Sequence, residues 1–179
     1  MADMFGCFVF TSSHTKHYYN SNSRMPPIKF LITGATGGLG SGVVSYFLSH
    51  NVPTTSFAVS SSRASNTELF TKKGLQFRHA AYSDTTSLYK AFEGVENLFF
   101  VSGMAYDTNE RVKEHKNVID AAVKTGVTHV CMPFHRFVLT LPHKVRQIWY
   151  TSLAWGGYGN ESKIDVQQAH LQTEVLLKK

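Results

Sequence analysis

Three glycines recur at intervals of three residues near the start of the chain. Gly34, Gly37 and Gly40 follow an apolar run, residues 28–32, and precede an apolar periodic segment, residues 43–48. This order is typical of a strand, a tight turn and a helix. In that context the pattern is a spacing variant of the dinucleotide fingerprint. The first glycine permits a sharp exit from the strand, the second lets the backbone approach a pyrophosphate, and the third lets the helix pack closely on the sheet.

The helix after these glycines would offer free N–H groups and a partial positive charge to phosphates. A glycine pattern framed by a strand and a helix is a much stronger signal than a lone triplet. The alternative is a glycine-rich turn that binds nothing. We predict a cofactor-binding loop of six residues: Gly34, Thr36, Gly37, Gly38, Leu39 and Gly40.

The end of the second predicted strand, residues 54–59, distinguishes NAD from NADP. An acidic side chain there would accept a hydrogen bond from the ribose 2′-OH and repel a 2′-phosphate. Ser60, Ser61, Ser62 and Arg63 follow this strand without an acid, and hydroxyls with a guanidinium suit a phosphate. Ser60 and Arg63 are therefore predicted cofactor contacts. NADP is the predicted cofactor and NAD the alternative, while a solvated loop charge is the competing interpretation of Arg63.

Strands and helices alternate along the chain, which predicts an α/β fold with a doubly wound parallel sheet. Further strands are predicted at residues 75–80 and 97–101, and helices at residues 70–73, 85–92 and 110–124. Residue types at the helix ends predict how these helices begin and stop. The predictions are a capping box of Ser65 with Glu68, an N-cap at Asp84, and helix ends at Gly74 and Gly126.

The basic excess does not indicate a nucleic-acid surface. The formal net charge is +6, of which residues 130–147 contribute +3, residues 1–24 contribute +1 and the remainder only +2. No apolar run reaches the length of a membrane span. Cys7 and Cys131 are the only cysteines, so neither a disulfide framework nor a metal site is predicted. A cytoplasmic protein that binds neither nucleic acid nor membrane is the resulting expectation.

Residues 1–24 end in a polar run without periodicity. We predict that they are disordered or a non-native extension, and that the domain comprises residues 25–179. Met25 stands directly before two prolines and the first strand. Translation is therefore expected to start at Met25.

Two apolar stretches, residues 128–132 and 148–153, compete for the place of the fifth strand. Removal of residues 130–147 leaves a helix end followed by one strand. That block begins with Val and ends with Gln, whose codons match intron boundaries. We predict that the block is a retained intron. A genuine surface insertion is the alternative, although ordered loops of this length are uncommon.

Five segments together resemble the NmrA-like family, whose members are atypical short-chain dehydrogenase relatives. The family includes quinone oxidoreductases and a nitrogen-repression regulator. The resemblance implies a Rossmann domain with a small C-terminal substrate region. Because family members continue beyond the last segment, it also implies a chain that is C-terminally truncated relative to the family. The segments are GATGGLG (34–40), EGVENLFFVSG (93–103), EHKNVIDAAVKTGVTH (114–129), YTSLAWGG (150–157) and QAHLQTEVLL (168–177).

The resemblance implies an NADPH-dependent oxidoreductase that passes hydride to a small molecule, a quinone or other conjugated carbonyl. Ser102 and Thr151, at the carboxyl ends of two strands, are predicted cofactor contacts. Tyr158 and Lys163 are five residues apart, so one helical face cannot present them as the YxxxK pair of ordinary short-chain dehydrogenases. Lys163 and His170 are the catalytic candidates, as groups that could polarise a carbonyl oxygen. A plain helix-surface role is the alternative for both.

Two alternatives to an enzyme stay open at this point. The first is a regulator that binds NAD(P) without turnover and signals to a protein partner, which the missing YxxxK pair favours. The second is an inactive truncated fragment whose sheet edge and helix face are left uncovered. Turnover of NADPH with quinones would separate the enzyme from the regulator.

Overall fold

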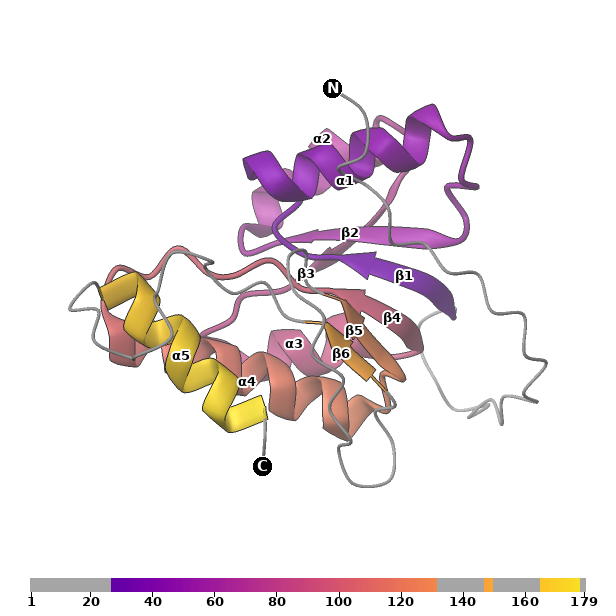
Figure 1. Ribbon diagram of the computed structural model, residues 1–179. Helices are drawn as coiled ribbons and strands as arrows, with labels where there is room; N and C mark the ends of the chain where they lie inside the picture. Colours follow the sequence, from indigo (N-terminus) through magenta and orange to yellow (C-terminus); the bar gives the residue numbers. More distant parts are fainter. Residues whose placement is uncertain (1–26, 132–146, 150–164, 178–179) are drawn as a thin grey trace.

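The computed structural model describes residues 27–131, 147–149 and 165–177. It contains a six-stranded parallel sheet with the strand order β3-β2-β1-β4-β5-β6 (Figure 1). The order reverses between β1 and β4, which makes the carboxyl ends of these two strands the topological switch point of the sheet. The strands are β1 (Ile28–Ile32), β2 (Phe57–Ser61), β3 (Gln76–His79), β4 (Val95–Phe99), β5 (His129–Cys131) and β6 (Gln147–Trp149).

Helices cover both faces of the sheet. Figure 1 shows α1 (Gly38–Ser49) and α2 (Thr67–Thr71), the latter preceded by the 3₁₀ turn η1 (Ala64–Asn66), on one face. The helices α3 (Thr85–Phe92), α4 (Thr108–Thr125) and α5 (Asp165–Leu177) lie on the other. Successive side chains of a strand point to opposite faces. Accordingly Phe57 and Val59 join the core under α1 and α2, whereas Ala58 joins the core under α3 and α4. The predicted doubly wound Rossmann fold is confirmed.

Two predicted helix ends are confirmed in detail. The Asp84 carboxylate accepts a hydrogen bond from the Thr86 N–H and caps α3. Gly126 ends α4 with a φ of +79°, a left-handed conformation that residues with a Cβ rarely adopt. Asp107, which the sequence analysis did not single out, caps α4 in the same manner by accepting from the Glu110 N–H.

The predicted capping box of Ser65 with Glu68 is wrong. Ser65 lies inside η1, and the N-cap of α2 is Asn66, which makes no capping bond with its side chain. The Asn66 amide instead donates to the Ser61 hydroxyl at 2.8 Å. A hydrogen bond to the end of β2, five residues earlier in the chain, therefore takes the place of the capping bond.

Two strands are shifted from their predicted positions. β2 begins at Phe57 rather than at residue 54, because the Ser56 N–H and hydroxyl both bond to the Pro53 carbonyl and close a turn. β4 begins at Val95 rather than at residue 97, because Val95 pairs with Ile28 of β1. A local turn sets the start of β2 and pairing with β1 sets the start of β4, rather than the apolar pattern of either strand.

Only one strand was expected between residues 128 and 153, and the structure has two. β5 pairs with β4, and β6 pairs with β5, with His129 opposite Gln147. Both apolar stretches therefore contribute to the sheet. Residues 132–146 lie outside the described part of the chain, so the retained-intron origin of residues 130–147 stays a prediction.

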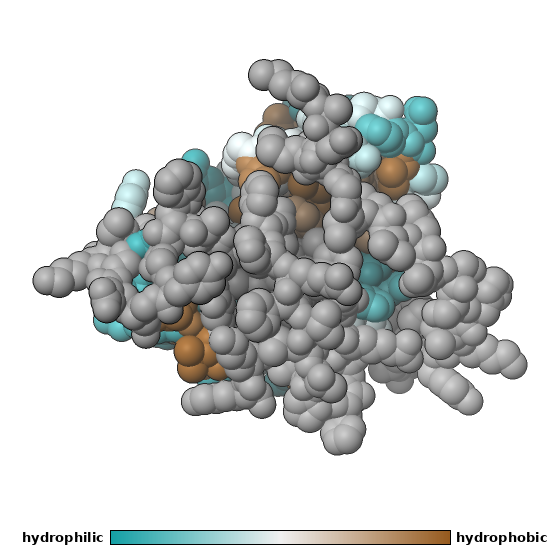
Figure 2. Space-filling model, in the orientation of Figure 1, coloured by the Kyte–Doolittle hydropathy of each residue, from teal (hydrophilic) through white to brown (hydrophobic). Residues whose placement is uncertain are grey.

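The helix α5 packs against α4. Figure 2 shows hydrophobic surface where α5 lies in Figure 1, and Val175 of α5 is 49% exposed. One side of α5 is therefore buried on α4 while apolar surface remains on another.

The contact between Gly40 and the turn after β1 should decide the stability of the α1–β1 unit. A Cβ at residue 40 would lie 2.3 Å from the Gly34 carbonyl oxygen, whereas a Cβ at Gly42 meets nothing within 4 Å. We expect Gly40→Ala to lower the free energy of unfolding by about 1–3 kcal/mol. Gly42→Ala, the matched control, should raise it by up to about 1 kcal/mol. Urea unfolding followed by circular dichroism measures both, and equal stability of the two variants would contradict the prediction.

Candidate functional site

The turn between β1 and α1 is built from backbone contacts. Gly34 has a φ of +61°, and its carbonyl accepts a hydrogen bond from the Gly37 N–H at 2.9 Å. The Ala35 N–H donates to the Ser60 carbonyl at 3.0 Å, which fixes the turn to the last residues of β2. The close approach of Gly40 to Gly34 then sets the start of α1 directly at the carboxyl end of β1.

In the part of the chain that the structure describes, the N-terminus of α1 has neither a side-chain cap nor an acidic residue in its first turn. Gly37 is the N-cap and has no side chain to accept a hydrogen bond, and the first turn contains no acidic residue. The first N–H groups of a helix have no partner within the helix, and they carry part of the positive end of the helix dipole. In contrast, the N-termini of α3 and α4 are each capped by an aspartate. The exposed first turn of α1 is therefore suited to an anionic ligand.

Gly37 and Gly38 have no packing role that explains them. A Cβ at Gly37 would make ordinary contact with the Gly34 oxygen at 3.4 Å, and one at Gly38 would meet nothing within 4 Å. Both residues are exposed. Glycine at these positions leaves the backbone open to close approach by a ligand.

The last residues of β2 and the two that follow it provide hydroxyls and a guanidinium beside this turn. Ser60 is wholly buried, and its hydroxyl oxygen has no hydrogen-bond partner among the described residues. The Ser61 hydroxyl accepts from the Asn66 amide and, at 3.3 Å, from the Arg63 N–H. Ser62 and Arg63 are exposed, and the first acid that follows, Glu68, is paired with Lys72 at 2.9 Å. The groups that an incoming phosphate can reach directly are thus those of Ser62 and Arg63.

A buried polar network joins β1 to the segment after β4. The Tyr82 hydroxyl lies 2.7 Å from both the Thr33 hydroxyl and the Val101 carbonyl oxygen. The Val101 N–H donates to the Thr33 hydroxyl at 2.9 Å, and Thr33 can donate to the Phe99 carbonyl at 3.2 Å. Burial raises the pKa of Tyr82 above its ordinary value, although the hydrogen bond with Thr33 acts in the opposite direction. The network holds the carboxyl ends of β1 and β4 together at the switch point.

Ser102 follows directly and contacts a buried histidine. The Ser102 hydroxyl is 3.0 Å from Nε2 of His115 on α4, and Nδ1 of His115 is 2.9 Å from the Thr173 hydroxyl on α5. His115 is fully buried. Burial, followed by the nearby His170 and Arg111, lowers the pKa of His115 to about 3. The imidazole is therefore neutral at physiological pH.

Glu114 is a titratable group beside the same segment. A Cβ at Gly103 would lie 2.6 Å from the Glu114 carboxylate, so the carboxylate occupies the space next to the Gly103 backbone. Partial burial is the main cause that raises the pKa of Glu114, with Glu110 adding to it and Arg111 opposing it. Glu114 thus holds its proton to higher pH than an ordinary glutamate does.

The structure brings most of the predicted cofactor residues to one edge. The glycine loop follows β1, Arg63 follows β2 and Ser102 follows β4, and these three strands are adjacent. Ser60 lies inside β2, near its carboxyl end, and is wholly buried. Thr151 and the catalytic candidate Lys163 lie outside the described residues. The other candidate, His170, is 6% exposed and packs its ring on that of His115 between α4 and α5. A catalytic role for Lys163 or His170 stays a prediction.

Sequence analysis missed three residues at this edge: Tyr82, Glu114 and His115. The signal for His115 was present, because it occupies an apolar position on the periodic face of a predicted helix. A histidine at such a position must find hydrogen-bond partners in the core. The partners themselves could not be inferred, since they lie on other elements.

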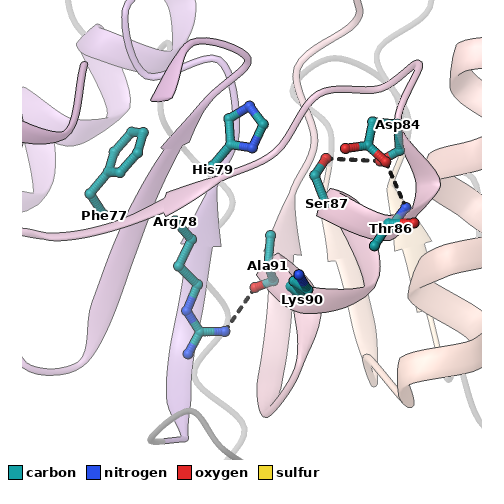
Figure 3. A pocket seen from close by; sticks show the side chains of 8 residues that line it. All are labelled: Phe77, Arg78, His79, Asp84, Thr86, Ser87, Lys90 and Ala91. Atoms are coloured by element: carbon teal, nitrogen blue, oxygen red, sulfur yellow. Dashed lines mark hydrogen bonds between the residues drawn. The ribbon is translucent and has the colours of Figure 1, made fainter. Parts of the chain in front are cut away.

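A separate hollow of about 280 Å³ lies between β3 and α3 (Figure 3). None of its lining residues belongs to the glycine turn. The Arg78 side chain reaches toward α3, where Nη1 donates to the carbonyls of Ala91 and Glu93 at 2.8 and 2.6 Å. Arg78 thereby satisfies carbonyls at the C-terminal end of α3, a structural role.

Within residues 27–131, 147–149 and 165–177, no group of three or more His, Cys, Asp or Glu side chains is placed to hold a metal ion. Among the helices of this described part, none combines the length and the apolar character needed to cross a membrane.

Comparison with known proteins identifies relatives that share this arrangement. The model of the NmrA-like family matches residues 28–133. The NmrA-like family domain-containing oxidoreductase flvB of Aspergillus flavus is 41% identical over 153 residues, which cover 84% of this chain and 44% of flvB. Quinone oxidoreductase 2 of Escherichia coli is 28% identical over 146 residues, which cover 82% of this chain and 43% of that protein.

Solved structures agree with these relatives. The triphenylmethane reductase of a Citrobacter species, complexed with NADP(H), superposes with a TM-score of 0.67 at 30% identity and covers 84% of this chain and 45% of its own. The NADPH complex of the E. coli quinone oxidoreductase gives a TM-score of 0.61 at 26% identity, covering 83% of this chain and 44% of its own. The chain thus spans less than half the length of each of these relatives.

Removal of the Tyr82 hydroxyl should change how stability depends on alkaline pH. The pKa of Tyr82 is raised in the folded protein, whereas in the unfolded chain the phenol ionises near its ordinary pKa of about 10. The hydroxyl therefore stabilises the fold below about pH 10, and this contribution is lost as the pH rises further. Tyr82→Phe should lower the free energy of unfolding by about 1–2 kcal/mol at neutral pH. It should also make the free energy of unfolding fall less steeply at alkaline pH.

Urea unfolding between about pH 8 and pH 11 measures this dependence. Tyr89→Phe is the control, because Tyr89 lies on α3 outside the network and its substitution should leave the alkaline decline unchanged. Identical pH profiles for the wild type and Tyr82→Phe would contradict the prediction.

Proposed function

The chain belongs to the NmrA-like family, and on this premise we propose that it is an NADPH-dependent oxidoreductase that passes hydride to a quinone or another conjugated carbonyl compound. The observation that carries the proposal is the uncapped, acid-free N-terminus of α1, placed at the switch point beside the exposed Ser62 and Arg63. The helix N-terminus suits a dinucleotide pyrophosphate, and Ser62 with Arg63 suits a 2′-phosphate.

The residues at this edge fit the cofactor in chemical terms. The N–H groups at the start of α1 would hold the pyrophosphate, and the exposed backbone of Gly37 and Gly38 leaves room for it to approach closely. The adenosine half would lie over the end of β2, where the Arg63 guanidinium makes no hydrogen bond or ion pair with the described residues. Ser62 and Arg63 would contact the 2′-phosphate there. The other half would extend over the end of β4, toward Ser102.

The relatives support the choice of cofactor. The Citrobacter triphenylmethane reductase is complexed with NADP(H) and the E. coli quinone oxidoreductase with NADPH. The absence of an acidic residue between the end of β2 and Glu68 agrees with NADP. NAD is the alternative cofactor, and a comparison of the affinities for NADPH and NADH decides between the two.

When bound, NADPH supplies the hydride, and the chain's own residues hold and orient it. The Thr33–Tyr82–Val101 network keeps the ends of β1 and β4 in fixed relation, so the two halves of the cofactor would rest on a rigid edge. Met104 and Tyr106, on the segment after Ser102, are 80% and 84% exposed. Their apolar side chains offer a surface for a flat aromatic substrate such as a quinone.

A second candidate is a regulator that binds NAD(P) without turnover and signals to a protein partner. The observation that favours it is the spacing of Tyr158 and Lys163, five residues rather than four. Both candidates require the cofactor, and only turnover distinguishes them.

Turnover of NADPH with a panel of quinones tests the proposed activity directly. Gly38→Asp provides an inactive control, because position 38 has space for a side chain and an acid in the first helical turn stabilises a helix by about 0.3–1 kcal/mol. The same charge would repel the pyrophosphate, so this variant should fold normally and lose binding and turnover together. Gly38→Asn controls for the added volume. NADPH binding without turnover in the wild type would favour the regulator.

Substitution of Arg63 tests whether this residue binds the 2′-phosphate. A guanidinium bonded to a phosphate contributes about 1.5–3 kcal/mol, so Arg63→Ala should weaken NADPH binding at least about tenfold and leave NADH binding unchanged. Lys113→Ala, at an exposed basic residue of α4, is the matched control and should alter neither affinity. Nicotinamide fluorescence titration measures the six dissociation constants, those of NADPH and NADH for the wild type and the two variants. A parallel loss for NADH and NADPH would show that Arg63 acts otherwise than through the 2′-phosphate.

A further inference from the structure

We propose that His115, oriented by Thr173 of α5, is a positioning residue that holds the Ser102 hydroxyl as a hydrogen-bond acceptor for the nicotinamide half of the dinucleotide. The proposal rests on the proposed function, because it assumes that a dinucleotide binds at this edge. It assigns a role to a fully buried histidine and to the C-terminal helix, neither of which contributes to the cofactor site described above.

The proton of Thr173 fixes the direction of the whole chain of hydrogen bonds. The Thr173 hydroxyl donates to the Ala169 carbonyl one turn earlier in α5, at 2.8 Å. A hydroxyl has one proton, so toward His115 the Thr173 oxygen acts as an acceptor. Nδ1 of His115, at 2.9 Å, must then carry the proton and donate it.

The remaining ring nitrogen is consequently an acceptor. A neutral imidazole carries one N–H, and His115 is kept neutral by its burial and by Arg111 and His170 nearby. With Nδ1 protonated, Nε2 has a lone pair, and the Ser102 hydroxyl at 3.0 Å donates to it. The proton of Ser102 thus points into the core, and its lone pairs are left for a ligand.

This arrangement does not make Ser102 a nucleophile with His115 as its base. The distances match such a pair, but a base must accept and hold a proton. The apolar surroundings and the neighbouring Arg111 and His170 disfavour a charged His115, and its third partner is a threonine rather than a carboxylate. The chain of contacts therefore orients Ser102 and does not activate it.

The place of Ser102 identifies what it would accept from. The preceding residue, Val101, lies against Gly34 of the turn, 3.2 Å from where a Cβ of Gly34 would stand. Ser102 is therefore on the β4 side of the glycine turn, whereas Ser62 and Arg63 are on the β2 side. A dinucleotide that lies across the turn with its 2′-phosphate near Arg63 directs the nicotinamide half toward Ser102. The ribose hydroxyls and the carboxamide NH₂ of that half are donors, which match an acceptor.

The imidazole tautomer can be read without any cofactor. Long-range ¹H–¹⁵N NMR correlation of the full 179-residue chain distinguishes a protonated Nδ1 from a protonated Nε2, and loss of one signal in His115→Gln assigns the residue. We expect the Nδ1–H form in the wild type and a shift to the Nε2–H form in Thr173→Val, where the acceptor is missing. A wild-type Nε2–H tautomer would overturn the proposal.

Binding of two ligands then tests the role toward the nicotinamide half. Ser102→Ala and Thr173→Val should each weaken NADPH binding by about three- to tenfold, the effect of one hydrogen bond. Both should leave unchanged the affinity for 2′-phosphoadenosine 5′-diphosphate, which keeps the pyrophosphate but lacks both the nicotinamide and its ribose. Thr125→Val is the matched control. Thr125 likewise donates to the carbonyl four residues earlier, Ala121, at 2.8 Å, but it does not contact His115.

The outcomes separate this proposal from the proposed function. An unchanged NADPH affinity in Ser102→Ala, with the wild type binding both ligands, would overturn the positioning role alone. An equal loss for both ligands in Thr173→Val would also overturn it, because the effect would then be a general loss of structure. Failure of the wild type to bind either ligand would overturn both proposals.

Discussion

The backbone contact between Gly40 and Gly34 is the constraint on which the ligand edge depends. A side chain at residue 40 would stand 2.3 Å from the Gly34 carbonyl oxygen, so only glycine lets α1 begin so close to β1. As a result, the first N–H groups of the helix lie at the carboxyl end of β1, a central strand of the sheet. A helix N-terminus in this position attracts anions through its backbone N–H groups, and no charged side chain is required for it.

The second constraint is the junction of β1 and β4, where the strand order reverses. Two backbone segments end there at once, and their polar groups would be costly to bury without partners. Tyr82 and Thr33 satisfy them through bonds to Val101 and to each other. Because these bonds are buried, they are strong and mutually supporting. A pocket edge that is fixed before a ligand arrives loses little entropy on binding.

His115 of α4 connects the buried core to the proposed ligand site at the edge of the sheet. His115 lies among aromatic and aliphatic neighbours, with its ring edge-on to that of Phe100 at a centroid distance of 5.2 Å. Desolvation keeps it neutral. A neutral imidazole has one donor and one acceptor nitrogen, so the hydrogen bond made by one nitrogen determines whether the other donates or accepts. Through it, α5 becomes part of the structure that determines how Ser102 meets a ligand. The site therefore depends on residues from both ends of the described chain.

Local sequence determined the features that act through the backbone over a few residues. The glycine turn, the Asp84 cap and the αL end of α4 at Gly126 could all be predicted, because each depends on the conformational range or the short side chain of one residue. The alternation of strands and helices likewise determined the doubly wound fold. Only the tertiary structure decided where β4 begins, since Val95 pairs with Ile28 of β1. It also gave His115 its function: the partners of that ring are 13 and 58 residues away, and folding alone brings them within hydrogen-bond distance.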